Sequence, residues 1–531
     1  MARAAACLSV LLAAALATSC SPAGPERRGD GQPLIDGTFT VSLAGDPGNL
    51  DPHHSATYAP AFVLSLAYEG LIARGPGGSV RPNLAERWEQ SPDRIRYTLR
   101  RGLTCADGTP LTLDDVADNY RYVLDPANRS THLGGGSVPA GTSIEIDRAA
   151  HALTLHTPTP HSFLLEMTGA IPIVCRPGLD DRARLRRGTE GTGLFRLTGS
   201  VSNSVYTFTR RDHYRWSPWG TRSDTPGVPK QVVVRIIPNQ TTAANLLLAG
   251  ELSAAAISGP DRRRVEAAGF DAFGSRGPAI QMWFNQAPGR VAADESVRRA
   301  LIAAVDRPLL ARIASAGLGM APRRLAGADP MACPAETVSA VPARFDMAEA
   351  NRLLDRAGWV RGADGIRSRG GRRLSLSLIW DFDFNDSTAS AYAAEYAVSQ
   401  WRELGAEVRA RSVNGAGAGE VLFGTGDYDI SWVPIVVSLP GRFLRFASGP
   451  VPPDGLNFPH IRLPEVERLA AEANEIAGPA SCPKWDAIER LYLASAAVLP
   501  VFDSDHAMLA RDARLAVNGL VMIAPSIRLI G

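Results

Sequence analysis

The chain has 531 residues, which is too long for one ordinary hydrophobic core, so we expect more than one domain. Its composition is that of a folded globular protein, with 45% hydrophobic and 21% charged residues. The 56 basic and 54 acidic residues leave a formal charge of only +2. This balance excludes the basic footprint of a nucleic-acid-binding protein, and we expect no nucleic-acid partner.

The first twenty residues have the pattern of an export signal. Arg3 gives a positive start, an apolar run follows from 4 to 17, and small residues precede Cys20. The apolar run is too short to span a bilayer, so we interpret residues 1–20 as a signal peptide. The small residues before Cys20 resemble a lipobox, which predicts lipidation of Cys20 and anchoring on the outer face of the cell membrane. The alternative is plain secretion with an unmodified Cys20. Residues 21–35 suit a flexible tether.

Four further cysteines would lie in an oxidising compartment, where disulfides are expected. They allow three pairings. We favour Cys105 with Cys175 and Cys333 with Cys482, because each pair then lies within one domain. The alternative is buried free thiols. No spacing of cysteine and histidine predicts a zinc site.

Three strands and three helices are predicted along the first 310 residues. The strands show apolar alternation or a short apolar run, and the helices have capping residues or end at glycine or before proline. The predicted strands are 38–43, 97–99 and 232–237, the last as a buried central strand, and the predicted helices are 112–124, 241–250 and 296–305.

The clearest local unit lies between residues 346 and 413. A helix capped by Asp346 is followed by a strand at 374–380, a helix ending at Gly405 and a strand at 406–410. Strand, helix and strand in this order predict a βαβ unit and parallel sheet. Ligands bind beyond the carboxyl ends of such strands, here at 380–384 and after 428–431.

Motifs for catalysis are absent from the sequence. The glycines of 415–419 lack the sixth glycine of a dinucleotide motif, and we interpret this segment as a flexible loop without a following helix. There is no phosphate-binding P-loop, no H-E-x-x-H and no G-x-S-x-G. His53-His54, the one histidine pair, is interpreted as a surface or loop feature. We therefore predict neither an enzyme nor a cofactor.

An ordered set of segments resembles the peptide- and nickel-type family of extracytoplasmic solute-binding proteins, family 5. The most specific part runs from Pro82 to Val116, and the matches extend over nearly the whole mature chain. They are 46–52, 67–71, 82–88, 91–93, 97–102, 107–112, 114–116, 191–197, 214–216, 250–252, 283–285, 297–301, 305–307, 348–359, 364–366, 427–429 and 457–458.

The resemblance implies an α/β fold of the type II periplasmic-binding-protein kind, with two lobes, a hinge and an extra domain in one lobe. Lobe I would comprise 36–60, 190–275 and 495–531, domain II 61–189, and lobe III 276–494. The implied role is that of a monomeric binding subunit of an ABC importer. It would close on a small molecule or oligopeptide and deliver it to a permease driven by ATPase subunits.

By position in the family, ten residues are expected to line the ligand cleft. They are Tyr58, Glu69, Trp283, Asn285, Trp380, Phe382, Trp432, Pro434, Ser438 and Arg442. For Trp283 and Trp380 a core position is an equal alternative, and for Glu69 a local structural role.

One departure from the family bears on the ligand. Peptide-binding relatives carry an acid soon after the strand that matches 429–432, where it pairs with the free amine of the peptide. Here 433–442 holds no acid, and its one charge is Arg442. An anionic, uncharged or N-blocked ligand is therefore favoured, with Arg442 or Arg445 as counter-charges; both could instead be solvated surface residues. Two other functions are compatible with the sequence. The protein could bind a metal chelate, an opine or a glycoside, or it could be a sensor or partner-binding lipoprotein without a role in import.

Overall fold

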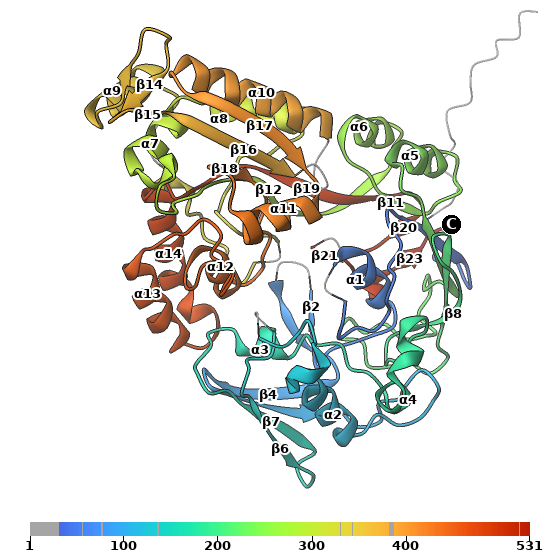
Figure 1. The fold of residues 1–531 in the computed structure, drawn as a ribbon. Helices are drawn as coiled ribbons and strands as arrows, with labels where there is room; N and C mark the ends of the chain where they lie inside the picture. The colour runs from blue at the N-terminus through green and yellow to red at the C-terminus, as the bar shows by residue number, and fades with distance from the viewer. Residues whose placement is uncertain are drawn as a thin grey trace, which may run out of the picture.

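The structure of the chain is a computed structural model, which describes residues 31–531 except 56, 76–77, 135–136, 330, 342–343, 382–386 and 520. It has the mixed α/β architecture expected from the sequence. Figure 1 shows one body at the upper left and a second below and to the right, with long strands running between them. We keep the names lobe I, domain II and lobe III for the ranges given above.

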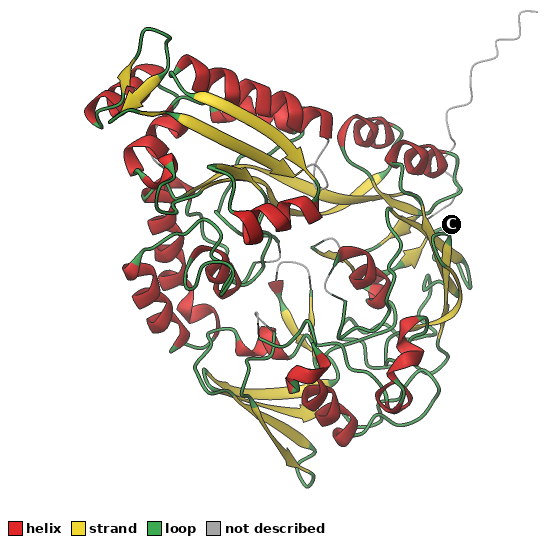
Figure 2. Cartoon of the chain, in the orientation of Figure 1, coloured by secondary structure: helices red, strands yellow, loops and turns green. Residues whose placement is uncertain are grey.

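One sheet of ten strands runs through both bodies (Figure 2). In spatial order the strands are β17 (Glu407–Val413), β16 (Ser375–Asp381), β18 (Ile430–Trp432), β12 (Asp271–Phe284), β19 (Val498–Ala510), β11 (Ala254–Ala256), β1 (Thr38–Leu43), β10 (Gln231–Ile236), β9 (Val205–Arg210) and β8 (Phe195–Val201). Strands β12 and β19 pair antiparallel from Asp271–Ala510 to Trp283–Val498, with register shifts between Pro278 and Gln281. These two long strands link lobe I to lobe III, and a bulged pair of strands is a natural place to bend.

Lobe III contains the predicted βαβ unit. β16 pairs parallel with β17, from Ser375–Glu407 to Asp381–Val413, which confirms the prediction. Its helices are α7 (Glu295–Ala303), α8 (Arg307–Ala314), α9 (Met347–Arg356), α10 (Ser387–Glu403), α11 (Gly415–Glu420), α12 (Pro440–Ala447), α13 (Pro464–Asn474) and α14 (Cys482–Ala494). The small strands β13 (Val360–Arg361), β14 (Arg367–Arg369) and β15 (Arg372–Arg373) form a separate sheet.

Domain II is built on an antiparallel sheet in the order β4-β5-β7-β6. Its elements are β2 (Ile72–Arg74), β3 (Val80–Pro82), β4 (Ala85–Ser91), β5 (Arg94–Leu99), α2 (Leu113–Leu124), β6 (Ser143–Asp147), β7 (Ala152–His156), α3 (Leu164–Thr168) and α4 (Arg176–Asp180). The helix predicted at 112–124 is α2, and Thr112 with Asp115 forms a capping box at its start.

Lobe I completes the right-hand part of the molecule in Figure 1. Beside its strands of the large sheet it has α1 (Tyr58–Leu64), α5 (Gln240–Leu248), α6 (Gly259–Ala267) and the short strands β20 (Ala513–Arg514), β21 (Val517–Asn518), β22 (Val521–Met522) and β23 (Arg528–Leu529). The strand predicted at 38–43 is β1, and the helix predicted at 241–250 is α5.

One local prediction is wrong. The glycine-rich segment 415–419 forms α11, because Asn414 accepts a hydrogen bond from the backbone N–H of Gly417 and so caps the helix.

Two further predictions are confirmed in part. Strand β10 is central, between β1 and β9, but Val232 and Val234 are buried while Val233 is only half-buried. The histidine pair lies in a loop, but His53 is buried, and its ring hydrogen-bonds the carbonyl of Pro172.

Two disulfides join the four cysteines. Cys105 is bonded to Cys175 and Cys333 to Cys482, the pairs favoured from the sequence. Each closes a long loop, with sequence separations of 70 and 149 residues. Long closed loops restrict the unfolded chain most, so both bonds stabilise the fold by about 4 to 5 kcal/mol in the chain-entropy model.

Candidate functional site

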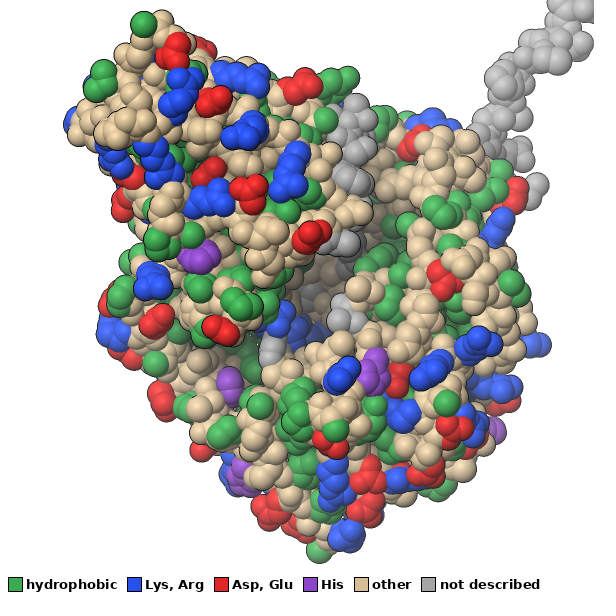
Figure 3. All heavy atoms as spheres, in the orientation of Figure 1, with side chains coloured by type: hydrophobic (Ala, Val, Ile, Leu, Met, Phe, Trp, Pro, Cys, Tyr) green, Lys and Arg blue, Asp and Glu red, His purple; other side chains and the backbone are tan. Residues whose placement is uncertain are grey.

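A deep hollow lies between the upper and lower bodies, and basic side chains are visible inside it (Figure 3). Two hydrogen bonds cross from domain II to lobe III beside it. Arg74, at the end of β2, donates to Ser438 Oγ at 2.8 Å, and Arg442 donates to Ser137 Oγ at 3.3 Å. We call this hollow the interlobe cleft.

Helix α12 is held rigidly at the lobe III side of the cleft. Phe443 is buried and its ring stacks on that of Trp283, with centroids 5.3 Å apart. The hydroxyl of Tyr492 on α14 donates to the carbonyl of Ala447 at 3.1 Å. Phe443 and Ala447 are one helical turn apart and face inward, which leaves Arg442 and Arg445 on the other side of the helix.

Three arginines gather where the domains meet: Arg74, Arg442 and Arg445, which we call the cleft arginines. Burial, together with the positive charges of Arg74 and Arg445, lowers the pKa of Arg442 to about 10. Burial also lowers the pKa values of Arg74 and Arg445. The carboxylate of Glu166 on α3 acts in the opposite direction on Arg74. Positive side chains from two domains thus meet here.

A polar chain connects the cleft arginines to lobe I. The ring of His132 lies 3.4 Å from Ser137 Oγ through Nδ1 and 3.1 Å from the carbonyl oxygen of Pro52 through Nε2. Burial lowers the pKa of His132, and the charge of Arg442 lowers it too. Ser137 thus lies between this imidazole and the guanidinium of Arg442.

Domain II also touches lobe III through a buried apolar contact, which we call the latch. Phe163 is 3% exposed and belongs to the hydrophobic cluster of lobe III that contains Trp283 and Trp485. Beside it, Ser162 Oγ donates to the carbonyl of Ala473 at 2.6 Å and accepts from Trp485 Nε1 at 3.2 Å. Separating the two domains would expose the Phe163 ring to water.

Four of the residues expected to line the cleft lie in the core of lobe III. Trp283, Asn285, Trp432 and Pro434 are all buried. Trp283 donates to the carbonyl of Val433 at 2.9 Å, and Asn285 donates to that of Tyr428 at 2.9 Å. For Trp283 this burial agrees with the core position that the sequence offered as an alternative, and the expected ligand role of the four residues stays a prediction.

Glu69 also has a structural role instead of a ligand role. Its carboxylate accepts hydrogen bonds from Tyr214 at 2.7 Å, Trp216 at 2.8 Å and Thr192 at 3.0 Å. Burial raises the pKa of Glu69, while these donors and the charge of Arg211 oppose the rise. With its acceptor oxygens occupied by this chain, Glu69 joins the start of domain II to the segment that returns to lobe I.

The other expected residues are distributed differently. Tyr58 and Trp380 are half-buried, and burial raises the pKa of Tyr58 to about 12. Ser438 and Arg442 lie at the crossing between domain II and lobe III. Phe382 and Cys20 lie outside the described residues. The sequence analysis missed Arg74, Ser137 and His132; basic residues at the end of a short strand carry no motif that would have found them.

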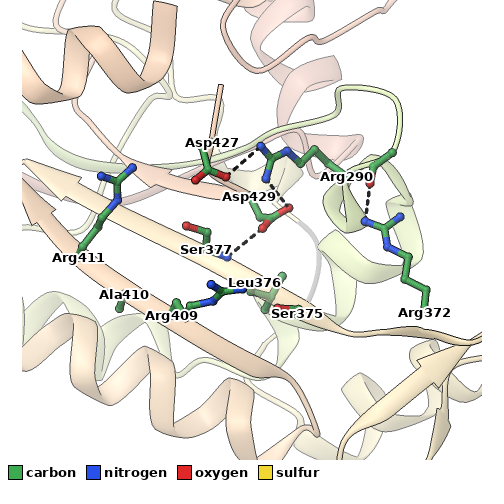
Figure 4. Close-up of a pocket in the computed structure, with 11 residues that line it drawn as sticks. Arg290, Arg372, Ser375, Leu376, Ser377, Arg409, Ala410, Arg411, Asp427 and Asp429 are labelled. Atoms are coloured by element: carbon green, nitrogen blue, oxygen red, sulfur yellow. Dashed lines mark hydrogen bonds and ion pairs between the residues drawn. The ribbon is translucent and has the colours of Figure 1, made fainter. Parts of the chain in front are cut away.

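A second pocket, of about 450 Å³, lies on the open face of the lobe III sheet (Figure 4). Its lining mixes arginines with acids: Arg290 lies 3.3 Å from Asp427 and 3.9 Å from Asp429, and Asp429 accepts from the backbone N–H of Ser377. Arg409 and Arg411 of the edge strand β17 line the same pocket. All of its lining residues come from lobe III.

Within the described part of the chain, no cluster of His, Cys, Asp and Glu has the arrangement of a metal site. Nor does any helix there have the length and apolar character needed to cross a membrane.

The family model for bacterial extracellular solute-binding proteins, family 5, matches residues 79–442. The chain belongs to this family. Protein XP55 of Streptomyces lividans is 30% identical over 413 residues, which cover 75% of this chain and 70% of that protein. The nickel-binding periplasmic protein of Escherichia coli is 26% identical over 391 residues, 70% of each chain.

Among solved structures, the oligopeptide-binding protein AppA of Bacillus subtilis, in complex with a nonapeptide, superposes with a TM-score of 0.72. The match covers 94% of this chain and 100% of that one at 17% identity, so it concerns the fold. The two-lobed fold expected from the resemblance is thereby confirmed. The Escherichia coli relative and AppA are named as binding proteins.

Proposed function

We propose that this protein is the extracytoplasmic binding subunit of an ABC importer, which captures a peptide or peptide-like small molecule between its lobes and delivers it to a membrane permease. Two features together carry the proposal. The bulged pair of strands β12 and β19 links the two lobes and can act as a hinge, and polar side chains of domain II and lobe III hydrogen-bond each other across the cleft. Ligand contacts on both sides of such a hinge favour the closed form. The lobe boundaries given above are part of this proposal, as are a monomeric state and the absence of catalysis.

The ligand class is narrowed by the chemistry of the cleft. The segment 433–442 holds no acid that would pair with a free amine, and Arg442 faces the cleft instead. A non-peptide ligand is the second candidate, supported by membership of a family that includes a nickel-binding relative. A sensor or partner-binding role without import is the third.

The place of action follows from the start of the chain. A signal peptide ending before Cys20 and a tether up to residue 35 would leave the folded body anchored by lipid at the outer face of the cell membrane. Labelling cells with radioactive palmitate tests this part of the proposal. We expect the wild type to incorporate the label and the Cys20→Ser variant not to.

Native mass spectrometry of the protein without residues 1–20, purified gently from its own host, tests the binding function. We expect a retained small molecule of one mass that is lost on denaturation. Adding it back to emptied protein should lower the radius of gyration in small-angle X-ray scattering. Protein that is empty, and is neither stabilised nor compacted by peptide and non-peptide libraries, would contradict capture and support the partner-binding role.

A further inference from the structure

One loop of lobe III lies between the long strand β12 and the cleft. It comprises residues 320–329 and 331–333, and we call it the support loop. The backbone N–H of Asp329 donates to the carbonyl of Arg276 on β12 at 2.7 Å, and the carbonyl of Asp329 accepts from the hydroxyl of Ser275. One side of the support loop is thus fixed to a strand that links the two lobes.

The other side of the support loop holds a short segment of the cleft, residues 435–438. Gly327 pairs with Val437 as a parallel bridge. The backbone N–H of Ala332 donates to the carbonyl of Ser438 at 3.1 Å. The hydroxyl of the same serine accepts a hydrogen bond from domain II. The support loop therefore lies directly behind the part of lobe III that meets domain II.

A buried glutamine joins the support loop to the cleft segment. Gln281 of β12 is 0% exposed. Its Oε1 accepts from the backbone N–H of Ile435 at 2.6 Å, and its Nε2 donates to the carbonyl of Leu325. Breaking either bond would leave a buried polar group unsatisfied. The two backbones are therefore held at a fixed separation.

The support loop is itself anchored on α14 at two points. Near its start, Arg324 forms ion pairs with Asp486 at 2.9 Å and with Glu489 at 3.0 Å. At its end lies Cys333, which directly follows the amide that bonds the cleft segment and is joined to Cys482 by a disulfide. A covalent bond thus fixes the residue next to a cleft contact.

The two disulfides of the chain differ in their surroundings. Cys105 and Cys175 are both buried in the core of domain II. In the second pair Cys333 is buried, but Cys482 is only half-buried. Access to the sulfur limits thiol–disulfide exchange, so a dissolved thiol attacks the second pair more readily.

We infer that the disulfide between Cys333 and Cys482 is a positioning element for ligand capture. It holds the support loop, and through the loop the cleft segment 435–438, in the binding conformation, so that reduction of this bond weakens binding. The inference rests on the proposed function and adds a redox dependence to it. A segment released from its anchor spends only part of its time in the binding conformation, and the apparent affinity falls by that fraction.

Hydrogen exchange tests the positioning without any ligand. The protein without residues 1–20 is compared with Cys333→Ser/Cys482→Ser and with a matched control, Cys105→Ser/Cys175→Ser, which loses the other long-loop disulfide. We expect exchange in peptides covering 325–333 and 433–439 to be at least about tenfold faster in the first variant only. Equal exchange at 433–439 in all three proteins would overturn the inference.

The small molecule retained in native mass spectrometry supplies the second arm. Wild type and both variants are purified side by side from the same host. Occupancy at least about fivefold lower in Cys333→Ser/Cys482→Ser, with the control unchanged, agrees with the inference. Equal occupancy in all three would overturn it and leave the proposed function intact. A wild type that retains no molecule counts against the proposed function, and hydrogen exchange then decides the inference alone.

Reduction of the folded wild type serves where the serine variant does not fold in the cell. Each dithiothreitol reduces one disulfide to two thiols and is itself oxidised to its cyclic disulfide. Alkylation with iodoacetamide identifies the reduced cysteines by mass. We expect Cys333 and Cys482 to be alkylated before Cys105 and Cys175, and occupancy to fall with the first pair. A reduced first pair with unchanged occupancy and unchanged exchange at 433–439 would overturn the inference.

Discussion

Two regions of this molecule bury charge in opposite ways. Around Glu69, one carboxylate receives three hydrogen bonds from the segment that returns from domain II to lobe I, and the charge of Arg211 lies nearby. At the cleft, Arg442 lies beside the positive charges of Arg74 and Arg445 and donates a hydrogen bond from lobe III to Ser137 of domain II. The first charge is held by acceptor-donor pairs that fix one domain connection, whereas the second lies where domain II meets lobe III.

The largest change in stability is expected from a substitution of Glu69. Glu69→Gln places an amide N–H₂ against groups that are themselves donors, so the free energy of unfolding should fall by about 3 kcal/mol. Urea denaturation followed by tryptophan fluorescence measures it. A loss below about 0.5 kcal/mol would mean that the three donors do not depend on this charge.

The smallest effect is expected on the pH dependence of stability, through the imidazole of His132. Burial and Arg442 lower the pKa of His132 in the folded state, so between that pKa and the ordinary value the unfolded chain binds the proton more readily. This contribution to stability is present above about pH 6.5 and is lost as the pH falls below that value. His132→Gln should therefore make the urea midpoint depend less steeply on pH between pH 7 and pH 6.

The sequence predicted best those parts of the fold that depend on neighbours in the chain. The capping box of α2 and the alternation of Leu374, Leu376 and Leu378 are local signals, and both elements are where they were expected. The glycines of 415–419 predicted a loop, because glycine has a low helix propensity. The segment is nevertheless helical, because Asn414 caps it and α11 packs in lobe III.

The cleft was harder to predict, because a residue on a strand can face either side. Trp283 and Trp432 occupy the expected strands but face the core. Arg442 was found from its position after β18. Arg74 was missed because its partner Ser438 lies 364 residues away, and no local pattern reports such a contact.

The latch, the buried contact of Phe163 with lobe III, affects the balance between the open and the shut form of the empty protein. Opening the cleft takes the Phe163 ring out of lobe III, at a cost of about 2 kcal/mol, which favours the shut form by about 30-fold if nothing opposes it. Under the proposed function, contacts made by a bound ligand would add to this apolar contact and favour the shut form further.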